Sequence, residues 1–223
     1  MSSPLKEFSR WQYRHLAAVA HKLGGPEVAR KLLTCRNVTV NFSADGQQAT
    51  IAAVTPTQKF LDEAKLVAVP DRSSTFDPHA FFQTREGCLY VWESYTNRIL
   101  AAAKKTEALP AMEITSFDLI KNANDGEIRG ELLKDHVFED ASEFCALLAG
   151  MIERQPNGKD GDLLNTGYVN IFYVRGVRGG VFTVSVYWSA DRRGWGVSAG
   201  PLGGDRWFAG YRVFSRNCSP SVA

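Results

Sequence analysis

Asp77, His79, Cys88 and His136 are the residues whose types allow nucleophilic or acid–base catalysis. A cysteine becomes a strong nucleophile when a helix N-terminus or a histidine lowers the pKa of its thiol. Cys88 is followed by Leu-Tyr-Val-Trp, which is typical of a strand, so a buried or half-buried structural cysteine is the favoured interpretation. A hydrolase or transferase with its site near the loop after Val69 is kept as an alternative hypothesis.

Elsewhere in the sequence, the spacing of histidines, cysteines and glycines matches no metal-binding or cofactor-binding motif. The four histidines show no H-x-x-x-H pair, and the four cysteines show no C-x-x-C pair. The glycine-rich stretches at residues 176–180 and 200–204 lack the Gly-Lys-Ser/Thr of a phosphate-binding loop, so we interpret them as β-turns. We therefore expect no metal and no cofactor.

The strongest compositional signal is the C-terminal part of the chain. From Thr166 onward there are seven arginines, no lysine and two acids, and 11 of the 25 aromatic residues lie there. Arginine and exposed aromatic rings together form the binding surfaces of proteins that hold single-stranded nucleic acids. The candidate binding residues are Arg178, Arg192, Arg193, Trp195, Arg206, Trp207 and Arg212.

Strand periodicity favours a competing interpretation of the same residues. In the expected strand at residues 168–174, apolar side chains alternate onto both faces, which is typical of a central strand covered on both sides. On this interpretation the aromatic residues belong to the core, and the arginines are solvent-exposed residues of the turns. Exposure of Trp188, Trp195 and Trp207 separates the two interpretations.

The elements of the C-terminal part are an amphipathic helix and a series of strands. Residues 140–155 are expected to form the clearest helix, with Asp140 and Glu143 at capping-box spacing and apolar residues on one face. Strands are expected at residues 112–120, 168–174, 181–188, 195–199 and 207–214. Short turns between successive strands indicate an antiparallel meander.

The N-terminal part is expected to place helices around a small hairpin. Helical spacing covers residues 5–23 and 26–33, and a hairpin with Asp45-Gly46 at its turn covers residues 38–54. A helix at residues 57–65 and a strand at residues 66–69 follow. Residues 88–92 are strand-like, although they could instead begin the helix that continues through Ala103.

The fold class is therefore α+β. Pro110 is the expected boundary between an N-terminal part, residues 1–110, and a C-terminal part, residues 111–223, with one continuous domain as the alternative. The polar N-terminus lacks the apolar segment of a secretory signal, and no apolar run is long enough to span a membrane. Scattered cysteines fit free thiols in a reducing compartment, so we expect a cytoplasmic protein that does not bind a membrane.

Three segments resemble a group of uncharacterised bacterial proteins. They are LLNTGYVNIFYV at residues 163–174, RVFSRN at residues 212–217 and the G-x-x-x-VARKLL stretch at residues 24–33. The resemblance implies a self-contained bacterial protein and implies no activity or site.

Three functions remain open from the sequence. The first is a non-enzymatic binding or interaction module that uses the arginine- and aromatic-rich C-terminal sheet, with single-stranded nucleic acid or another protein as its partner. The second is the hydrolase or transferase described above. The third is a structural or assembly protein that pairs through a sheet edge.

Overall fold

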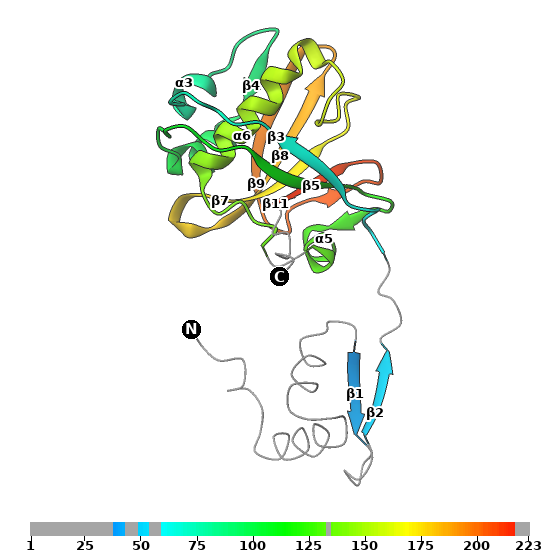
Figure 1. The fold of residues 1–223 in the computed structure, drawn as a ribbon. Coiled ribbons are helices and arrows are strands. Elements are labelled where there is room, and N and C mark those ends of the chain that lie inside the picture. The colour runs from blue at the N-terminus through cyan, green and yellow to red at the C-terminus, as the bar shows by residue number, and fades with distance from the viewer. Residues whose placement is uncertain (1–37, 43–48, 54–58, 133–134, 217–223) are drawn as a thin grey trace. The chain divides into compact units, whose positions relative to one another are not determined.

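The computed structural model describes residues 38–42, 49–53, 59–132 and 135–216. The chain divides into two compact units, Met1–Gln58 and Lys59–Ala223. In the first unit, β1 (Val38–Phe42) pairs antiparallel with β2 (Ala49–Ala53) (Figure 1). The helices expected at residues 5–23 and 26–33 lie outside the described residues.

The second unit is built on a seven-stranded mixed sheet in the order β3-β5-β11-β7-β8-β9-β4. Its strands are β3 (Lys65–Val69), β4 (Leu89–Val91), β5 (Met112–Asp118), β7 (Asn170–Arg175), β8 (Val181–Ser189), β9 (Gly194–Pro201) and β11 (Arg212–Arg216). The α+β class is thus confirmed. Strands from both sides of Pro110 belong to this sheet, and the division into units falls at Gln58 instead.

The last strand departs from the expected meander. β7, β8 and β9 are consecutive antiparallel neighbours, but β11 lies on the other side of β7 and runs parallel to it. The expected strand at residues 207–214 is divided, because β10 (Arg206–Trp207) pairs with β6 (Ala123–Asn124) before the chain reaches β11. Gly210, with a φ of 92°, lies in the connection between β10 and β11.

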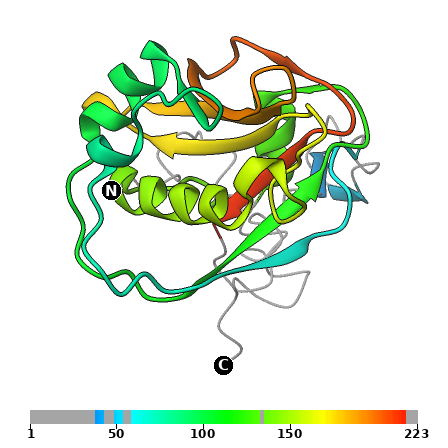
Figure 2. The same cartoon turned by 90° about the horizontal axis from the view of Figure 1, so that it is seen from above.

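Helix α6 (Ala141–Arg154) covers one face of the sheet, as expected (Figure 2). Asp140 caps it by accepting hydrogen bonds from the backbone N–H groups of Ser142 and Glu143. Under the helix, the rings of Phe172 and Phe214 stack with centroids 4.7 Å apart, and the two residues are opposite each other in the β7–β11 ladder. This contact anchors β11 beside β7.

The opposite face carries a second core around α5 (Asp125–Glu131). Asn124 and Glu127 form a complete capping box at the start of α5. Ile171 and Tyr173 of β7 point into this second core, while Phe172 and Val174 point into the core under α6. The expectation that the strand at residues 168–174 is central and covered on both faces is confirmed.

Short helices complete the second unit. They are α3 (Pro78–Phe81), α4 (Glu93–Arg98) and the 3-10 turns η2 (Leu100–Ala102), η3 (Pro156–Gly158) and η4 (Val177–Gly179). The segment that begins at residue 88, expected as either a strand or the start of a helix, contains both, because β4 is followed directly by α4. No helix among the described residues is long and apolar enough to cross a membrane.

The helix expected at residues 57–65 is wrong in its described part. The backbone N–H groups of Phe60 and Leu61 donate to the carboxylate of Glu131, and Leu61 forms a β-bridge with Leu119. Both side chains are buried in the second core. Tertiary contacts therefore hold this segment extended and override its local preference.

Candidate functional site

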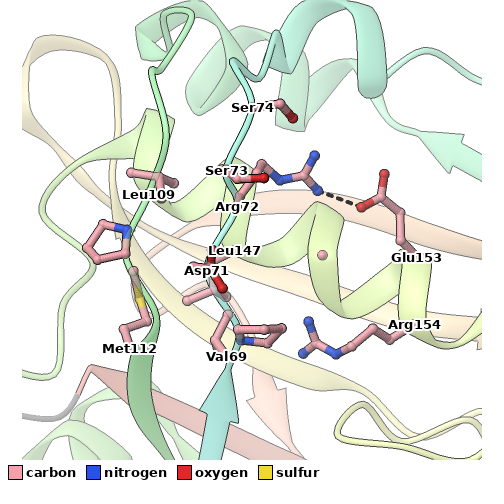
Figure 3. A pocket seen from close by; sticks show the side chains of 14 residues that line it. Val69, Asp71, Arg72, Ser73, Ser74, Leu109, Met112, Leu147, Glu153 and Arg154 are labelled. Carbon is pink, nitrogen blue, oxygen red and sulfur yellow. Dashed lines mark hydrogen bonds and ion pairs between the residues drawn. The ribbon is translucent and has the colours of Figure 1, made fainter.

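A cavity of about 350 Å³ lies between the segment that follows β3 and helix α6 (Figure 3). Its walls come from residues 69–74, from residues 109–112 at the start of β5, and from the C-terminal half of α6. The volume falls at the lower end of the usual range for ligand pockets, roughly 300–1,000 Å³. We call this space the α6 cavity.

Two extended segments that continue β3 and β5 form one wall. Arg72 and Leu109 exchange both backbone hydrogen bonds, at 2.9 and 2.8 Å, and Phe76 and Thr106 do the same farther along. The two segments therefore run side by side past α6 (Figure 2). Pro70 has no N–H group, so the regular ladder ends there.

The floor of the α6 cavity is apolar and its rim is charged. Val69, Met112 and Leu147 line the floor (Figure 3). Gly150 of α6 also lines the cavity and leaves the helix surface without a side chain there. A Cβ atom at Gly150 would meet only Nη1 of Arg154, at 3.4 Å. Because an interior glycine costs a helix roughly 0.5–1 kcal/mol relative to alanine, this position keeps the cavity open at the expense of helix stability.

Two ion pairs form the charged rim. Nη2 of Arg72 lies 2.5 Å from Oε2 of Glu153, and Nη2 of Arg154 lies 3.1 Å from Oδ2 of Asp162. The Arg72–Glu153 pair connects the segment after β3 to the end of α6 (Figure 3). Exposed pairs of this kind contribute about 0–1 kcal/mol, so their partners can exchange readily.

The backbone of the cavity wall has an open side. In an antiparallel ladder, successive residues alternate between bonding the neighbouring strand and facing away from it. Since Arg72 bonds Leu109, the N–H and C=O groups of Val67, Val69 and Asp71 face away from β5. No described residue forms a backbone hydrogen bond with them from that side. β3 is an edge strand of the sheet, and its Leu66 side chain is 69% exposed.

The other edge of the sheet is covered. Arg85 and Leu89 exchange backbone hydrogen bonds at the outer side of β4. The Thr84 hydroxyl group also accepts a hydrogen bond from the backbone N–H of Val91. Of the two edges, β3 is therefore the one that no other described segment covers.

The comparisons with known proteins add no relative. No family model, no curated protein and no solved structure matches the chain. The resemblance to uncharacterised bacterial proteins stays a prediction.

The candidate binding residues of the C-terminal sheet do not form one surface. Trp195 is 1% exposed and donates its indole N–H to the carbonyl of Gln155, while Trp207 is 5% exposed and donates to Asp125. Neither indole is available to stack on a base. Arg212 forms an ion pair with Asp118 at 2.7 Å, with only 18% of its side chain exposed.

The four remaining arginines are exposed but separated. Arg178 lies in η4 at the start of β8, and Arg192 and Arg193 lie in the turn after the end of that strand. Nine residues of strand separate these two ends, about 26 Å at the usual rise. Arg206 lies in β10, which pairs with β6 outside the main sheet.

The candidate catalytic residues do not meet either. Asp77 caps α3 and pairs with Lys105, whose hydrogen bond lowers the pKa of the Asp77 carboxyl, and Nε2 of His79 lies 3.2 Å from the carbonyl of Ala103. Cys88 lines a separate cavity of about 180 Å³, and the expectation that it is buried or half-buried is wrong, because it is exposed just before the first residue of β4. His136 is buried in contact with Arg129, 2.9 Å from the Arg129 Nε to the His136 Nε2. In the described residues, no group of three His, Cys, Asp or Glu could hold a metal ion.

The loop after Val69 does contribute to a cavity, through residues that sequence reasoning had not selected. Arg72, Gly150, Glu153 and Arg154 are the functional candidates that it missed. Of these four residues, Gly150 is the one that the sequence pattern could have identified. A glycine inside an otherwise strong helix pattern indicates a packing or functional reason for its presence.

Proposed function

We propose that this protein is a non-enzymatic binding module that takes an extended peptide of a partner protein as an added strand beside β3. The observation that carries the proposal is the open backbone edge of Val67, Val69 and Asp71, of which Val69 and Asp71 line the α6 cavity. Strand addition uses such an edge for affinity and a neighbouring pocket for side-chain specificity.

Three features of the edge support this partner. The open N–H and C=O groups offer hydrogen bonds of about 0.5–1.5 kcal/mol each. The exposed Leu66 provides apolar surface that an added strand would cover. The floor formed by Val69, Met112 and Leu147 offers a place for an apolar side chain of the peptide.

The test is selection of peptides with free C-termini, about 5–6 residues long as strands usually are, on the full chain. Binding of the selected peptides is then measured by fluorescence polarisation to the wild type and to two variants. Gly150→Leu fills the cavity and should abolish binding, while Gly150→Ala, the matched control, should keep it. Selection of no peptide, or equal binding to both variants, would overturn the proposal.

Amide hydrogen exchange locates the peptide independently of the variants. Bound peptide should slow exchange at Val67, Val69 and Asp71, whose N–H groups face the open side. The N–H groups of Leu66 and Ala68 are already bonded to β5 and should change little. Protection of a different strand would place the peptide elsewhere and contradict the proposal.

A second copy of the chain is the competing occupant of the edge. The mass in solution should stay that of a monomer over a wide concentration range. A dimer that Val67→Pro dissociates would assign the edge to self-assembly and overturn the peptide proposal.

A further inference from the structure

Arg72 is held in place independently of Glu153. Its backbone forms both hydrogen bonds with Leu109, and its guanidinium carbon lies 4.6 Å from the ring centroid of Phe76. Only 23% of its side chain is exposed. A guanidinium has five N–H donors, and within the described residues the Arg72 side chain donates one hydrogen bond, to Glu153. Arg72 is therefore a fixed donor with capacity for a second acceptor.

Glu153 is the exchangeable member of the pair. Its side chain is 49% exposed, and it lies in the last turn of α6. The negative end of the helix dipole disfavours a carboxylate at that position. Because the Glu153 side chain is half exposed, its carboxylate can turn into solvent and leave Arg72 to a ligand carboxylate.

The ion pair also limits the length of an added strand. It connects the segment after β3 to α6, so a peptide that runs along β3 meets it at the far end of the cavity (Figure 3). A peptide whose last residue reaches this point runs parallel to β3. Its terminal carboxylate then lies at Arg72, and its last side chain lies over the apolar floor of Val69 and Leu147.

We propose that the α6 cavity recognises the free C-terminal carboxylate of the added peptide strand, which displaces Glu153 from Arg72. The proposal rests on the proposed function and assigns its specificity. Bidentate pairing of a guanidinium with a carboxylate provides both the energy and the geometry of this recognition. The preferred last residue is apolar, because the floor beneath the carboxylate is apolar.

The experiment compares two fluorescein-labelled forms of the tightest peptide from the selection, one with a free carboxylate and one with a C-terminal amide. The wild type should bind the amide at least about tenfold more weakly, as expected for loss of a charge-assisted hydrogen bond. Arg72→Gln should reduce binding of the acid to the level of the amide. Glu153→Gln should strengthen binding of the acid several-fold, because it removes the competing carboxylate.

Opposite effects of the two variants distinguish recognition from a structural ion pair. A purely structural pair predicts that both variants change the melting temperature and that neither separates acid from amide. Arg206→Gln, an exposed arginine outside the cavity, is the charge control and should leave both peptides unchanged. Equal binding of acid and amide to the wild type, or weaker acid binding by Glu153→Gln, would overturn the inference.

Failure of this inference can be told from failure of the proposed function. If acid and amide peptides bind the wild type equally and neither binds the Gly150→Leu variant, strand addition is retained. Only recognition of the terminal carboxylate is then rejected. Hexanoate is the probe for a free carboxylic acid. A third outcome is that hexanoate displaces the labelled peptide as well as unlabelled peptide does, while peptide binding leaves amide exchange at Val67 and Val69 unchanged. That result would reject both strand addition and recognition of a peptide C-terminus.

Discussion

The indole ring of Trp188 packs directly on the backbone of Gly158. A methyl group added at Gly158 would overlap this ring, and the residue has a φ of 67°, in the left-handed region. Gly158 ends η3, the turn that follows α6, and Trp188 belongs to β8. The contact therefore fixes the chain after the helix against the sheet. It requires glycine both because a side chain would overlap the indole and because the backbone is in the left-handed region.

Gly158→Ala should be more destabilising than a change of backbone conformation alone explains. Gly167 is the matched control, because its φ is 85° and nothing lies within 4 Å of the position that a Cβ would take. Gly167→Ala should cost about 1–2 kcal/mol for the left-handed conformation. Gly158→Ala should cost clearly more in urea unfolding, since the methyl group also displaces Trp188. Equal losses would show that the indole moves aside freely.

The buried carboxylate of Asp125 should be the most sensitive polar position of the second core. It accepts hydrogen bonds from the Tyr173 hydroxyl at 3.1 Å, the Trp207 indole at 2.7 Å and the backbone N–H of Gly203 at 2.6 Å. Burial and the nearby carboxylate raise the pKa of Tyr173, so its hydroxyl stays protonated and donates. Asp125→Ala leaves three donors without this acceptor and should lower the free energy of unfolding by about 3 kcal/mol or more.

Urea unfolding of Asp125→Ala should be compared with that of Glu107→Ala. Glu107 is exposed, so its loss should change stability by no more than about 0.5 kcal/mol. A loss below about 1 kcal/mol for Asp125→Ala would mean that water replaces the carboxylate.

The ion pairs of Asp118 should make stability depend on acidic pH. Burial raises the pKa of this carboxyl, but the hydrogen bonds from Arg212 and Lys65 outweigh it, so the pKa lies below its usual value. A depressed pKa in the folded state contributes stability above the unfolded value, about 3.9, and this contribution disappears as the pH falls through the folded value. Asp118→Asn should therefore be less stable than the wild type near neutral pH, and the difference should shrink towards pH 3 or so. A difference that is constant with pH would contradict this.

The buried thiol of Cys145 should make stability depend on alkaline pH. Burial raises the pKa of Cys145 to about 12, whereas an unfolded thiol ionises near about 8.5. The unfolded state therefore loses its proton first, so the free energy of unfolding should fall as the pH rises above about 8.5. For this one group the loss should reach about 2 kcal/mol by about pH 10. Cys145→Ala should start from a lower stability and decline less steeply.

Thiol labelling checks the same assignment without unfolding. Cys88 is exposed and Cys145 is buried, with its sulfur 3.2 Å from the Tyr95 hydroxyl. In a variant with Cys35 and Cys218 replaced by serine, Cys88 should react rapidly with a thiol reagent. Cys145 should react only at the rate of unfolding. Equal rates would mean that the core under α6 opens readily.

Most of the fold near α6 could be predicted from local sequence. The capping aspartate Asp140 and the apolar spacing after it determine one helix face regardless of distant residues, so periodicity located α6 to within one residue at each end. The apolar side chains on both faces of β7 likewise require burial on both sides. Segment 59–64 was assigned wrongly, because Glu131, about 70 positions away, bonds its backbone.

The sequence by itself determined the α+β class, helix α6 and the central position of β7, since these depend on the period of apolar residues along a short stretch. Only the tertiary structure decided the order of the strands and the exposure of the aromatic residues. Trp195 and Trp207 have the residue types of a binding surface, but packing against α6 and α5 buries them. The α6 cavity likewise has Arg72 on one side and Gly150 and Glu153 of α6 on the other. Arg72 lies far from the two helix residues in the chain, and the two sides meet only when β3 and α6 pack together. Local patterns record how each segment is buried, whereas the partners of a segment depend on long-range packing.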